Sequence, residues 1–297
     1  MKQSLIILLT IVLFNCGPKE VITITGSETM HGMAEYLGNE FEKENSKIKV
    51  QVFGGGSLEG ITKLISGETN IALSSRDLQE KELASLSKKG DLEKLTIAYD
   101  GVAIVVHPSN PIAKLDLKSI SNIFQGKIQN WKQVGGLDKP IQVIVRNDKS
   151  GTLSYFTDHI LKQKDLGIKE FEKNKNNDYI SSAKTVSDNN DMADFIAKNP
   201  NAIGFMGMGS ANLENKGKLK ALSYAIQPSD PFIEPSIENV YNRKYRMSRA
   251  LYMIYRADSH EKVDAFSSFL TSEVGQELIL KRGYLRASLP EVEVKAE

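Results

Sequence analysis

Residues 21–41 read VITITGSETMHGMAEYLGNEF and combine a strand pattern with a helix pattern. The first five residues of this stretch are β-branched, which favours a strand. The apolar residues Met30, Met33, Leu37 and Phe41 then recur at the spacing of one helix face. A short polar loop separates the two patterns, so the stretch predicts a strand that leads directly into a helix.

The same alternation of strand and helix patterns continues along most of the chain. Further strands are expected at 48–52, 71–73, 95–106, 141–145, 202–206 and 250–255. Further helices are expected at 58–65, 77–88, 117–124 (with Asp116 as its N-cap), 155–161, 190–198 and 261–280. The polar segment 162–178 is expected to be a solvated insertion with little regular structure. This order predicts an α/β fold with a mainly parallel sheet and helices on both faces, in which ligands bind at the carboxyl ends of the strands.

The composition is that of an ordinary globular protein, with 40% hydrophobic and 25% charged residues. The formal net charge is +1, which does not favour a nucleic acid as partner, although a local positive site could still hold a small anion. Cys16 is the only cysteine, so no disulfide can form within the chain. The four histidines (His31, His107, His159 and His260) are scattered without metal-ligand spacing. We therefore expect neither a metal nor a cofactor.

Residues 1–16 resemble a lipoprotein signal peptide. One lysine is followed by an almost entirely apolar run at 5–14, which suits the core of a signal peptide and is too short to span a bilayer. Cys16 follows at a position that resembles a lipobox, although Phe14 and Asn15 stand where small residues are usual. The pattern predicts a lipid on Cys16 that attaches the mature chain to a membrane. An ordinary secretory signal that contains a cysteine is the alternative.

Four loops between a strand pattern and a helix pattern share one chemistry. They span 26–30, 54–57, 74–77 and 146–152, and each carries hydroxyl-bearing residues or glycines near the start of the helix. Unpaired N–H groups at helix starts attract anions, and glycine lets the backbone approach a ligand closely. The same residue types are common N-caps, so a single loop would indicate little. All four together predict an anion site, provided that they converge in space.

Arg146 is the sharpest individual candidate. It ends a predicted strand and precedes Ser150, Gly151 and Thr152 at the start of a helix. Its planar guanidinium suits bidentate recognition of a phosphate, and Asp148 could orient it. A surface ion pair is the alternative interpretation of this arginine.

Other motifs contribute less. Arg76 is a weaker candidate because Asp77 beside it could pair with it. The glycine-rich loop at 54–57 lacks the Gly-Lys-Ser/Thr of a P-loop, and no nucleophile elbow is present. We therefore expect no catalytic residues and no enzyme. The alternative among enzymes is a phosphatase with similar oxyanion loops.

Eight segments occur together in the order of a known family. They are ITITGS at 22–27, GGGS at 54–57, SSRDL at 74–78, DGVAIVVHP at 100–108, IFQGKIQNW at 123–131, RNDKSGT at 146–152, NAIGF at 201–205 and SRALY at 248–252. With them the chain resembles the phosphate-binding subunit of the Pst-type phosphate ABC importer over essentially its whole mature length. The resemblance implies a type II periplasmic-binding-protein fold, in which two α/β lobes enclose a ligand cleft.

The resemblance also implies a division of the chain. Lobe 1 is expected to comprise 21–100 and 224–288, and lobe 2 is expected to comprise 101–223. Strands would cross between the lobes near Asp100 and Ser223. The last residues, 289–297, are expected to form a loose tail.

By resemblance, the phosphate contacts come from all four loops. They are Thr29, Met30 (through its backbone N–H), Ser57, Ser75, Arg76, Arg146, Ser150, Gly151 and Thr152. Asp148 matches the carboxylate that pairs with the phosphate arginine. No residue is implied to be catalytic or to bind a metal.

Ser75 departs from the best-known members of the family, which have an aspartate there. That carboxylate accepts a hydrogen bond from a protonated phosphate oxygen and repels fully ionised sulfate. Other members carry Ser-Ser-Arg, as this chain does, and Glu28 and Asp77 are alternative acceptors here. Phosphate is favoured, with sulfate and molybdate as alternative ligands.

The expected function is extracytoplasmic binding of inorganic phosphate and its delivery to the permease subunits of an ABC importer. The chain is expected to act as a monomer, with no nucleic acid as partner. It would lie in the periplasm or at the cell surface, attached through the lipid on Cys16. A lipoprotein that kept the fold and serves in surface interactions is the alternative.

Overall fold

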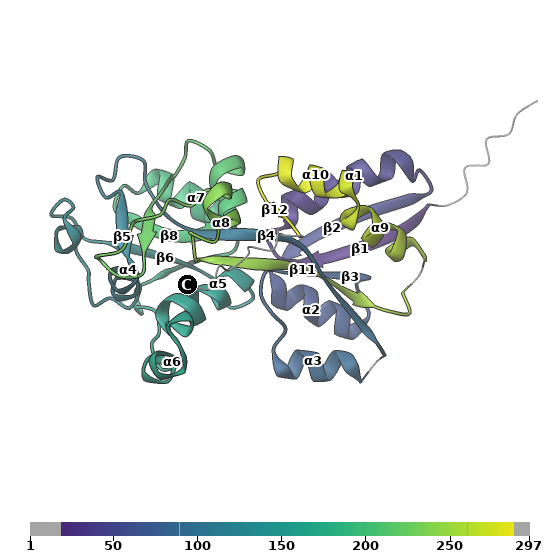
Figure 1. The fold of residues 1–297 in the computed structure, drawn as a ribbon, viewed down its shortest axis with the longest axis horizontal. Helices are drawn as coiled ribbons and strands as arrows, with labels where there is room; N and C mark the ends of the chain where they lie inside the picture. Colours follow the sequence, from purple (N-terminus) through teal and green to yellow (C-terminus); the bar gives the residue numbers. More distant parts are fainter. Residues whose placement is uncertain (1–18, 89, 260, 288–297) are drawn as a thin grey trace, which may run out of the picture.

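The computed structural model describes residues 19–88, 90–259 and 261–287 as two halves joined by a pair of strands (Figure 1). These strands, β4 (Leu92–Val106) and β11 (Ser248–Arg256), run antiparallel across the middle of the molecule. The apolar stretch that ends in Val106 is therefore long because it serves both halves.

One half is built on the βα units at the start of the chain. Helices α1, α9 and α10 cover one face of its sheet, and α2 and α3 cover the other (Figure 1). Its elements are β1 (Glu20–Gly26), α1 (His31–Glu44), β2 (Ile48–Gly55), α2 (Ser57–Ser66), β3 (Ile71–Ser74), α3 (Glu80–Ser87), α9 (Glu261–Thr271), α10 (Glu273–Lys281) and β12 (Leu285–Arg286). In α1, Met33, Leu37 and Phe41 are buried as their helical spacing predicts.

The other half contains the middle of the chain (Figure 1). Its strands are β5 (Lys114–Asp116), β6 (Gln142–Arg146), β7 (Lys184–Val186), β8 (Ala202–Gly207), β9 (Lys220–Ala221) and β10 (Ser223–Ala225). Its α-helices are α4 (Leu117–Phe124), α5 (Gly151–Phe156), α6 (Ile168–Asn174), α7 (Asn189–Lys198) and α8 (Ile237–Tyr241). Short 3-10 or π turns lie at η1 (Trp131–Val134), η2 (Thr157–Leu161), η3 (Lys164–Leu166) and η4 (Ser210–Glu214).

One sheet runs through both halves, in the order β2-β1-β3-β11-β4-β8-β6-β7. β1 is parallel to β2 and β3, and β6 is parallel to β7 and β8. The two crossing strands are antiparallel to each other and to their neighbours β3 and β8. The predicted parallel βα units are thus present in each half, and the crossing strands make the whole sheet mixed.

Two large hydrophobic clusters fill the two halves. One takes its side chains from α1, β1, β3 and α9, and the other from β4, β6, β8 and α4. Along β4, the change from one cluster to the other falls between Ala98 and Val102. Where the chain enters the second crossing strand, β11, Tyr245 and Met247 still pack in the second cluster, and Leu251 packs in the first. We therefore propose that the second crossing lies at the start of β11, later in the chain than the predicted Ser223.

Two expectations about helices need correction. The segment 162–178 is not devoid of structure, because η3 and α6 lie within it. α6 has no buried residue, so its composition resembles that of a loop. The single helical region expected at 261–280 is two helices, because the Ser272 side chain accepts the Gly275 N–H and starts a new helix there.

Other features agree with the sequence. The Asp116 side chain accepts the Ser119 N–H and caps α4 as predicted. No helix among residues 19–88, 90–259 and 261–287 has the length and apolar character needed to cross a bilayer. The predicted signal peptide, with Cys16, and the predicted tail at 289–297 lie outside the described residues.

Candidate functional site

The loop between β1 and α1 is shaped by a glycine that no other residue could replace. Gly26 has φ +149°, and a Cβ at this position would collide with the backbone of Leu73 on the neighbouring strand. The Ser27 N–H donates to the Leu73 carbonyl (2.9 Å), which holds the loop against β3. Thr29 is consequently buried at the start of α1, where its hydroxyl faces the other half of the molecule.

The second and third loops bring two serines together. Gly56, with φ +95°, turns the chain into α2, and Ser57 follows as its first residue. The Ser75 N–H donates to the Ser57 hydroxyl (3.1 Å), and the two hydroxyl oxygens lie 3.3 Å apart. Both serines are fully buried, so their hydroxyls form one polar point beneath the surface.

The fourth loop reaches this point from the other half. The Ser150 side chain accepts the Leu153 N–H (3.2 Å) and caps α5. Gly151 comes next and lies so close to Ser57 and Ser75 that a Cβ would collide with both hydroxyls. Since Gly151 and the serines belong to different halves, the loops meet across the interface.

Further contacts close the same interface. The Leu58 N–H donates to the Lys149 carbonyl (3.1 Å). The ammonium of Lys149 pairs with Glu59 (2.9 Å) on the opposite half. The hydroxyl oxygens of Thr29 and Thr152 lie 2.9 Å apart. All four predicted loops therefore converge, and the described conformation is closed.

Arg146 is almost completely buried, with 2% of its surface exposed. Its Nη1 donates to the Asn189 side-chain oxygen (2.6 Å) and its Nη2 donates to the Ser187 carbonyl (2.8 Å). Its Nε–H has no hydrogen-bond partner among the described residues. Burial lowers the pKa of this guanidinium, and the carboxylate of Glu28 is the strongest influence in the other direction. The arginine is thus a buried cation held mainly by neutral oxygens.

The predicted partner of Arg146 is wrong. Asp148 is exposed, and no ion pair in the described part of the chain joins it to Arg146. It lies in the turn that follows β6, and its side chain faces solvent. Closeness in sequence did not bring the two charges together.

The guanidinium of Arg76 is already paired with a carboxylate, so it is not free to bind an anion. Its two terminal nitrogens donate to the Glu82 carboxylate (2.8 and 2.6 Å), and one also donates to the Asp77 carbonyl. The Asp77 carboxylate pairs instead with Lys94 (2.9 Å). The alternative that Arg76 serves in an ion pair is therefore what the structure shows, with Glu82 rather than Asp77 as the carboxylate.

Of the two alternative acceptors, Glu28 lies closer to the converging loops. Its carboxylate accepts the Gly55 N–H at 2.5 Å and so braces the glycine-rich loop. The other alternative, Asp77, is engaged by Lys94.

Sequence reasoning missed Arg249, which lies on β11. It is 6% exposed, and its Nη2 donates to Thr29 (3.1 Å) and Thr152 (3.0 Å). The same nitrogen lies 3.5 Å from a carboxylate oxygen of Asp100, directly opposite on β4. The available signal was an arginine immediately before the apolar run at 250–255.

Asp100 is the only carboxylate that forms an ion pair with Arg249 in the described part of the chain. It is fully buried, and it accepts the Met208 N–H (3.0 Å). Burial raises the pKa of Asp100 to about 6, against the opposing charge of Arg249. Its charge is therefore sensitive to mild acid.

This property predicts how stability depends on pH. The pKa of Asp100 is raised from 3.8 to about 6, so the folded state holds a proton that the unfolded state has released between these values. The wild type should therefore gain stability relative to Asp100→Asn as the pH falls from 7 to 4, on the order of 3 kcal/mol. Urea denaturation at pH 7, 5 and 4 measures this difference.

Asp138→Asn is the control for that experiment. Lys132 lowers the pKa of this exposed carboxyl, so the wild type should lose a small amount of stability relative to this variant in acid. Parallel stability profiles for the wild type and Asp100→Asn would show that Asp100 does not titrate as described.

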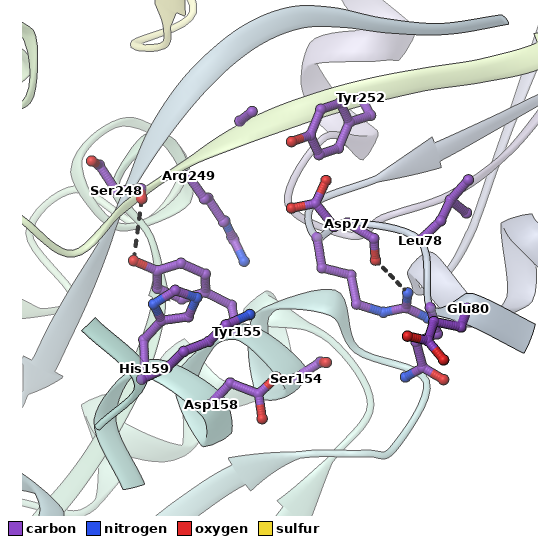
Figure 2. Close-up of a pocket in the computed structure, with 14 residues that line it drawn as sticks. Asp77, Leu78, Glu80, Ser154, Tyr155, Asp158, His159, Ser248, Arg249 and Tyr252 are labelled. Atoms are coloured by element: carbon purple, nitrogen blue, oxygen red, sulfur yellow. Dashed lines mark hydrogen bonds between the residues drawn. The ribbon is translucent and has the colours of Figure 1, made fainter. Parts of the chain in front are cut away.

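A cleft of about 400 Å³ lies beside the converging loops (Figure 2). It is lined from one half by Asp77 and Leu78, from the other by Tyr155 and His159, and from β11 by Arg249. Figure 2 shows Arg249 pointing from β11 into the space between Tyr155 and Asp77. The cleft touches the site through Arg249, while the hydroxyls of the four loops are packed against one another next to it.

No group of three or more His, Cys, Asp and Glu side chains is placed to hold a metal ion in the part of the chain that the structure describes. The chemistry of the site is therefore that of its donors: two buried guanidiniums, several hydroxyls and the N–H groups at helix starts. Such a set suits an oxyanion.

Comparison with known proteins agrees with this geometry. A family model described as a PBP superfamily domain matches residues 16–274. The structure of an ABC-type phosphate transport receptor from Vibrio cholerae is 31% identical, with a TM-score of 0.67 and coverage of 89% of this chain and 99% of that one. The chain belongs to the PBP superfamily, as a PstS-like member. The predicted family and the predicted α/β periplasmic-binding-protein fold are confirmed.

Other relatives support the same placement of this PstS-like chain. The phosphate-binding protein PstS of Borreliella burgdorferi is 28% identical over 292 residues, covering 96% of this chain and 99% of its own length. The structure of an ABC-transporter substrate-binding protein from Clostridium perfringens, solved with bound phosphate, has a TM-score of 0.77 at 27% identity. It covers 90% of this chain and 99% of that one. The similarity thus extends over both halves of the PstS-like fold.

Proposed function

We propose that the chain binds inorganic phosphate outside the cytoplasm and delivers it to the permease of an ABC importer. The burial of Arg146 without a carboxylate partner carries this proposal. A buried cation is costly unless a counter-charge lies close to it. Its unpartnered Nε–H and the converging hydroxyls suit a small anion that supplies this charge.

The other donors fit a tetrahedral oxyanion. Thr29 stands just before α1 and Ser57 is the first residue of α2, so each hydroxyl lies at a helix start. The Met30 N–H, which was predicted to contact phosphate, donates to the Ser27 carbonyl (3.0 Å) in this conformation. Thr152 and Gly151 approach them from the other half. Donors from several directions match an anion with four oxygens.

The relatives support phosphate in particular. One similar structure holds bound phosphate, and curated relatives such as the protein from Borreliella burgdorferi are named phosphate-binding proteins. These relatives are binding proteins, in agreement with the expectation that the chain is not an enzyme. Sulfate and molybdate remain the alternative ligands because Ser75 is not a carboxylate.

The proposed mechanism is capture followed by closure. The contacts between Thr29 and Thr152, and between Gly151 and the two serines, can form only when the two halves are together. An anion held by groups from both halves stabilises this closed state relative to the open one. The closed form is the one that would dock on the permease, with the chain acting as a monomer.

A calorimetric titration tests the function. The secreted Cys16→Ser chain, freed of bound ligand, is titrated near neutral pH with phosphate and, separately, with sulfate. We expect one phosphate per chain with much weaker binding of sulfate, and light scattering should give the mass of a monomer. Preference for sulfate or molybdate would change the ligand, and no binding of any oxyanion to the folded chain would favour a role in surface interactions.

We also propose that Cys16 carries the lipid that attaches the chain to the membrane, at the periplasmic face or the cell surface. The apolar run at 5–14 and the cysteine that follows it support this. Wild-type cells should incorporate labelled palmitate into the chain, and cells with Cys16→Ser should not. Absence of label in the wild type would favour the ordinary secretory signal.

A further inference from the structure

Arg249 lies at the point where the two halves meet. It stands on the crossing strand β11, and its register partner on the other crossing strand is Asp100. The ring centroid of Tyr155 is 5.6 Å from its guanidinium carbon. The Tyr155 hydroxyl donates to the Ser248 carbonyl (3.2 Å), which fixes the ring beside the arginine (Figure 2).

The hydrogen bonds of Arg249 have only one possible direction. Its Nη2 lies 3.1 Å from the Thr29 hydroxyl oxygen and 3.0 Å from that of Thr152. A guanidinium carries donors and no acceptor, so both hydroxyl oxygens must accept. The proton of each threonine then has to point to some other acceptor.

Only one such acceptor is present within the pair itself. The oxygens of Thr29 and Thr152 lie 2.9 Å apart, so one hydroxyl donates to the other. No acceptor for the second proton is present among the residues that the structure describes. A bound anion could accept from both threonines, while Arg249 remains their donor.

The ion pair with Asp100 does not use all the hydrogen-bond donors of Arg249. The distance to Asp100 is 3.5 Å, which is long for a charge-assisted hydrogen bond. Asp100 also accepts the Met208 N–H, and Arg249 Nε and Nη1 have no hydrogen-bond partner among the described residues. A purely structural arginine would be expected in a bidentate pair, as Arg76 is with Glu82.

We propose that Arg249 is a positioning residue that makes Thr29 and Thr152 act only as donors toward the bound oxyanion. This side of the site then offers no acceptor for the proton of a protonated ligand oxygen. Because the two threonines come from different halves, Arg249 sets this polarity only in the closed state. The proposal rests on the proposed function and assigns a role in it to a residue of the crossing strand.

A double-mutant cycle tests the proposal by titrating inorganic phosphate into the secreted Cys16→Ser chain. Arg249→Met removes every donor, and the combined Thr29→Val and Thr152→Val change removes the hydroxyls that accept from it. We expect Arg249→Met to weaken phosphate binding by about 10- to 100-fold when the threonines are present. In the valine background it should weaken binding by less than about 3-fold, because its effect passes through the hydroxyls. An equal loss in both backgrounds would overturn the proposal, since Arg249 would then act through its charge alone.

Conservative rescue provides the second readout. Arg249→Lys keeps a group that only donates, so it should bind phosphate more tightly than Arg249→Met by about 5-fold or more. Arg246→Met makes the same chemical change at an exposed arginine just before β11 and should leave affinity unchanged. Equal affinity in the lysine and methionine variants would contradict a role that depends on donors.

Folding is controlled separately. Arg249→Met leaves Asp100 buried without its cation, so the cycle is repeated with Asp100→Asn in all four chains if this variant fails to fold. Failure of the wild type to bind phosphate would reject the proposed function itself. Tight binding by the wild type, with no coupling in the cycle, would reject only the role of Arg249.

Discussion

Replacing Arg146 with alanine is expected to lower the affinity for phosphate by about 100-fold or more, since charge-assisted hydrogen bonds to the anion are lost. The stability of the ligand-free protein should change little. Arg146 donates to Asn189 and to a backbone carbonyl, but its removal also removes a buried charge that has no carboxylate partner. Calorimetric titration and urea denaturation of the same preparation measure the two effects.

Two further variants sharpen this experiment. Arg146→Lys keeps the charge and loses the planar fork, so its affinity should fall between those of the wild type and Arg146→Ala. Arg246→Ala removes an exposed arginine and should bind phosphate as the wild type does. Wild-type affinity in Arg146→Ala, or a loss of several kcal/mol in its ligand-free stability, would show that the arginine is structural.

The second large effect is expected for Gly151→Ala. The added methyl would collide with the hydroxyls of Ser57 and Ser75 on the opposite half, so the two halves could not close fully. Overpacking of this kind costs about 1–3 kcal/mol, which corresponds to roughly a 5- to 150-fold loss of phosphate affinity. Small-angle scattering should show that saturating phosphate compacts the wild type and leaves the variant more open.

Gly32→Ala is the matched control. Gly32 also lies in the first turn of a helix, and a Cβ there would meet only the flexible ends of the Glu214 and Arg282 side chains. Glu214 comes from the other half, as the two serines do, but its exposed side chain can move aside without separating the halves. Its affinity and compaction should therefore match those of the wild type. If Gly151→Ala closed normally around phosphate, the contact between Gly151 and the serines would not be part of the closed state.

Local patterns predicted much of the fold. Strand β4 was expected from its β-rich composition, helix α1 from helical spacing, and Asp116 as the cap of α4. The helix α6 was missed because none of its residues is buried, so no apolar periodicity marks it. Periodicity records burial, and an exposed helix leaves little trace of it.

The site was predicted only in part, because some of its contacts join residues that are distant in sequence. Arg146 was expected because a strand end and a following Ser-Gly-Thr loop are local features. Arg76 was expected by resemblance to contact phosphate, whereas its guanidinium reaches Glu82 on the next helix. Asp148 was expected to pair with Arg146, two residues before it in sequence, whereas its side chain turns to solvent. Arg249 was missed because its partners Thr29 and Thr152 are far away in sequence and meet it only in the folded molecule.

The position of Arg249 and Asp100 on the two crossing strands has a consequence for the order of events in phosphate capture. When two rigid bodies rotate about a hinge, atoms on its axis move least, so these two charges stay in place while Thr29 and Thr152 swing toward each other. An incoming anion therefore meets the fixed charges of Arg249 and Asp100 first, and the hydroxyls of Thr29 and Thr152 only afterwards. Under the proposed closure, ionic strength governs how fast the anion arrives, and the hydroxyl geometry governs how long it stays.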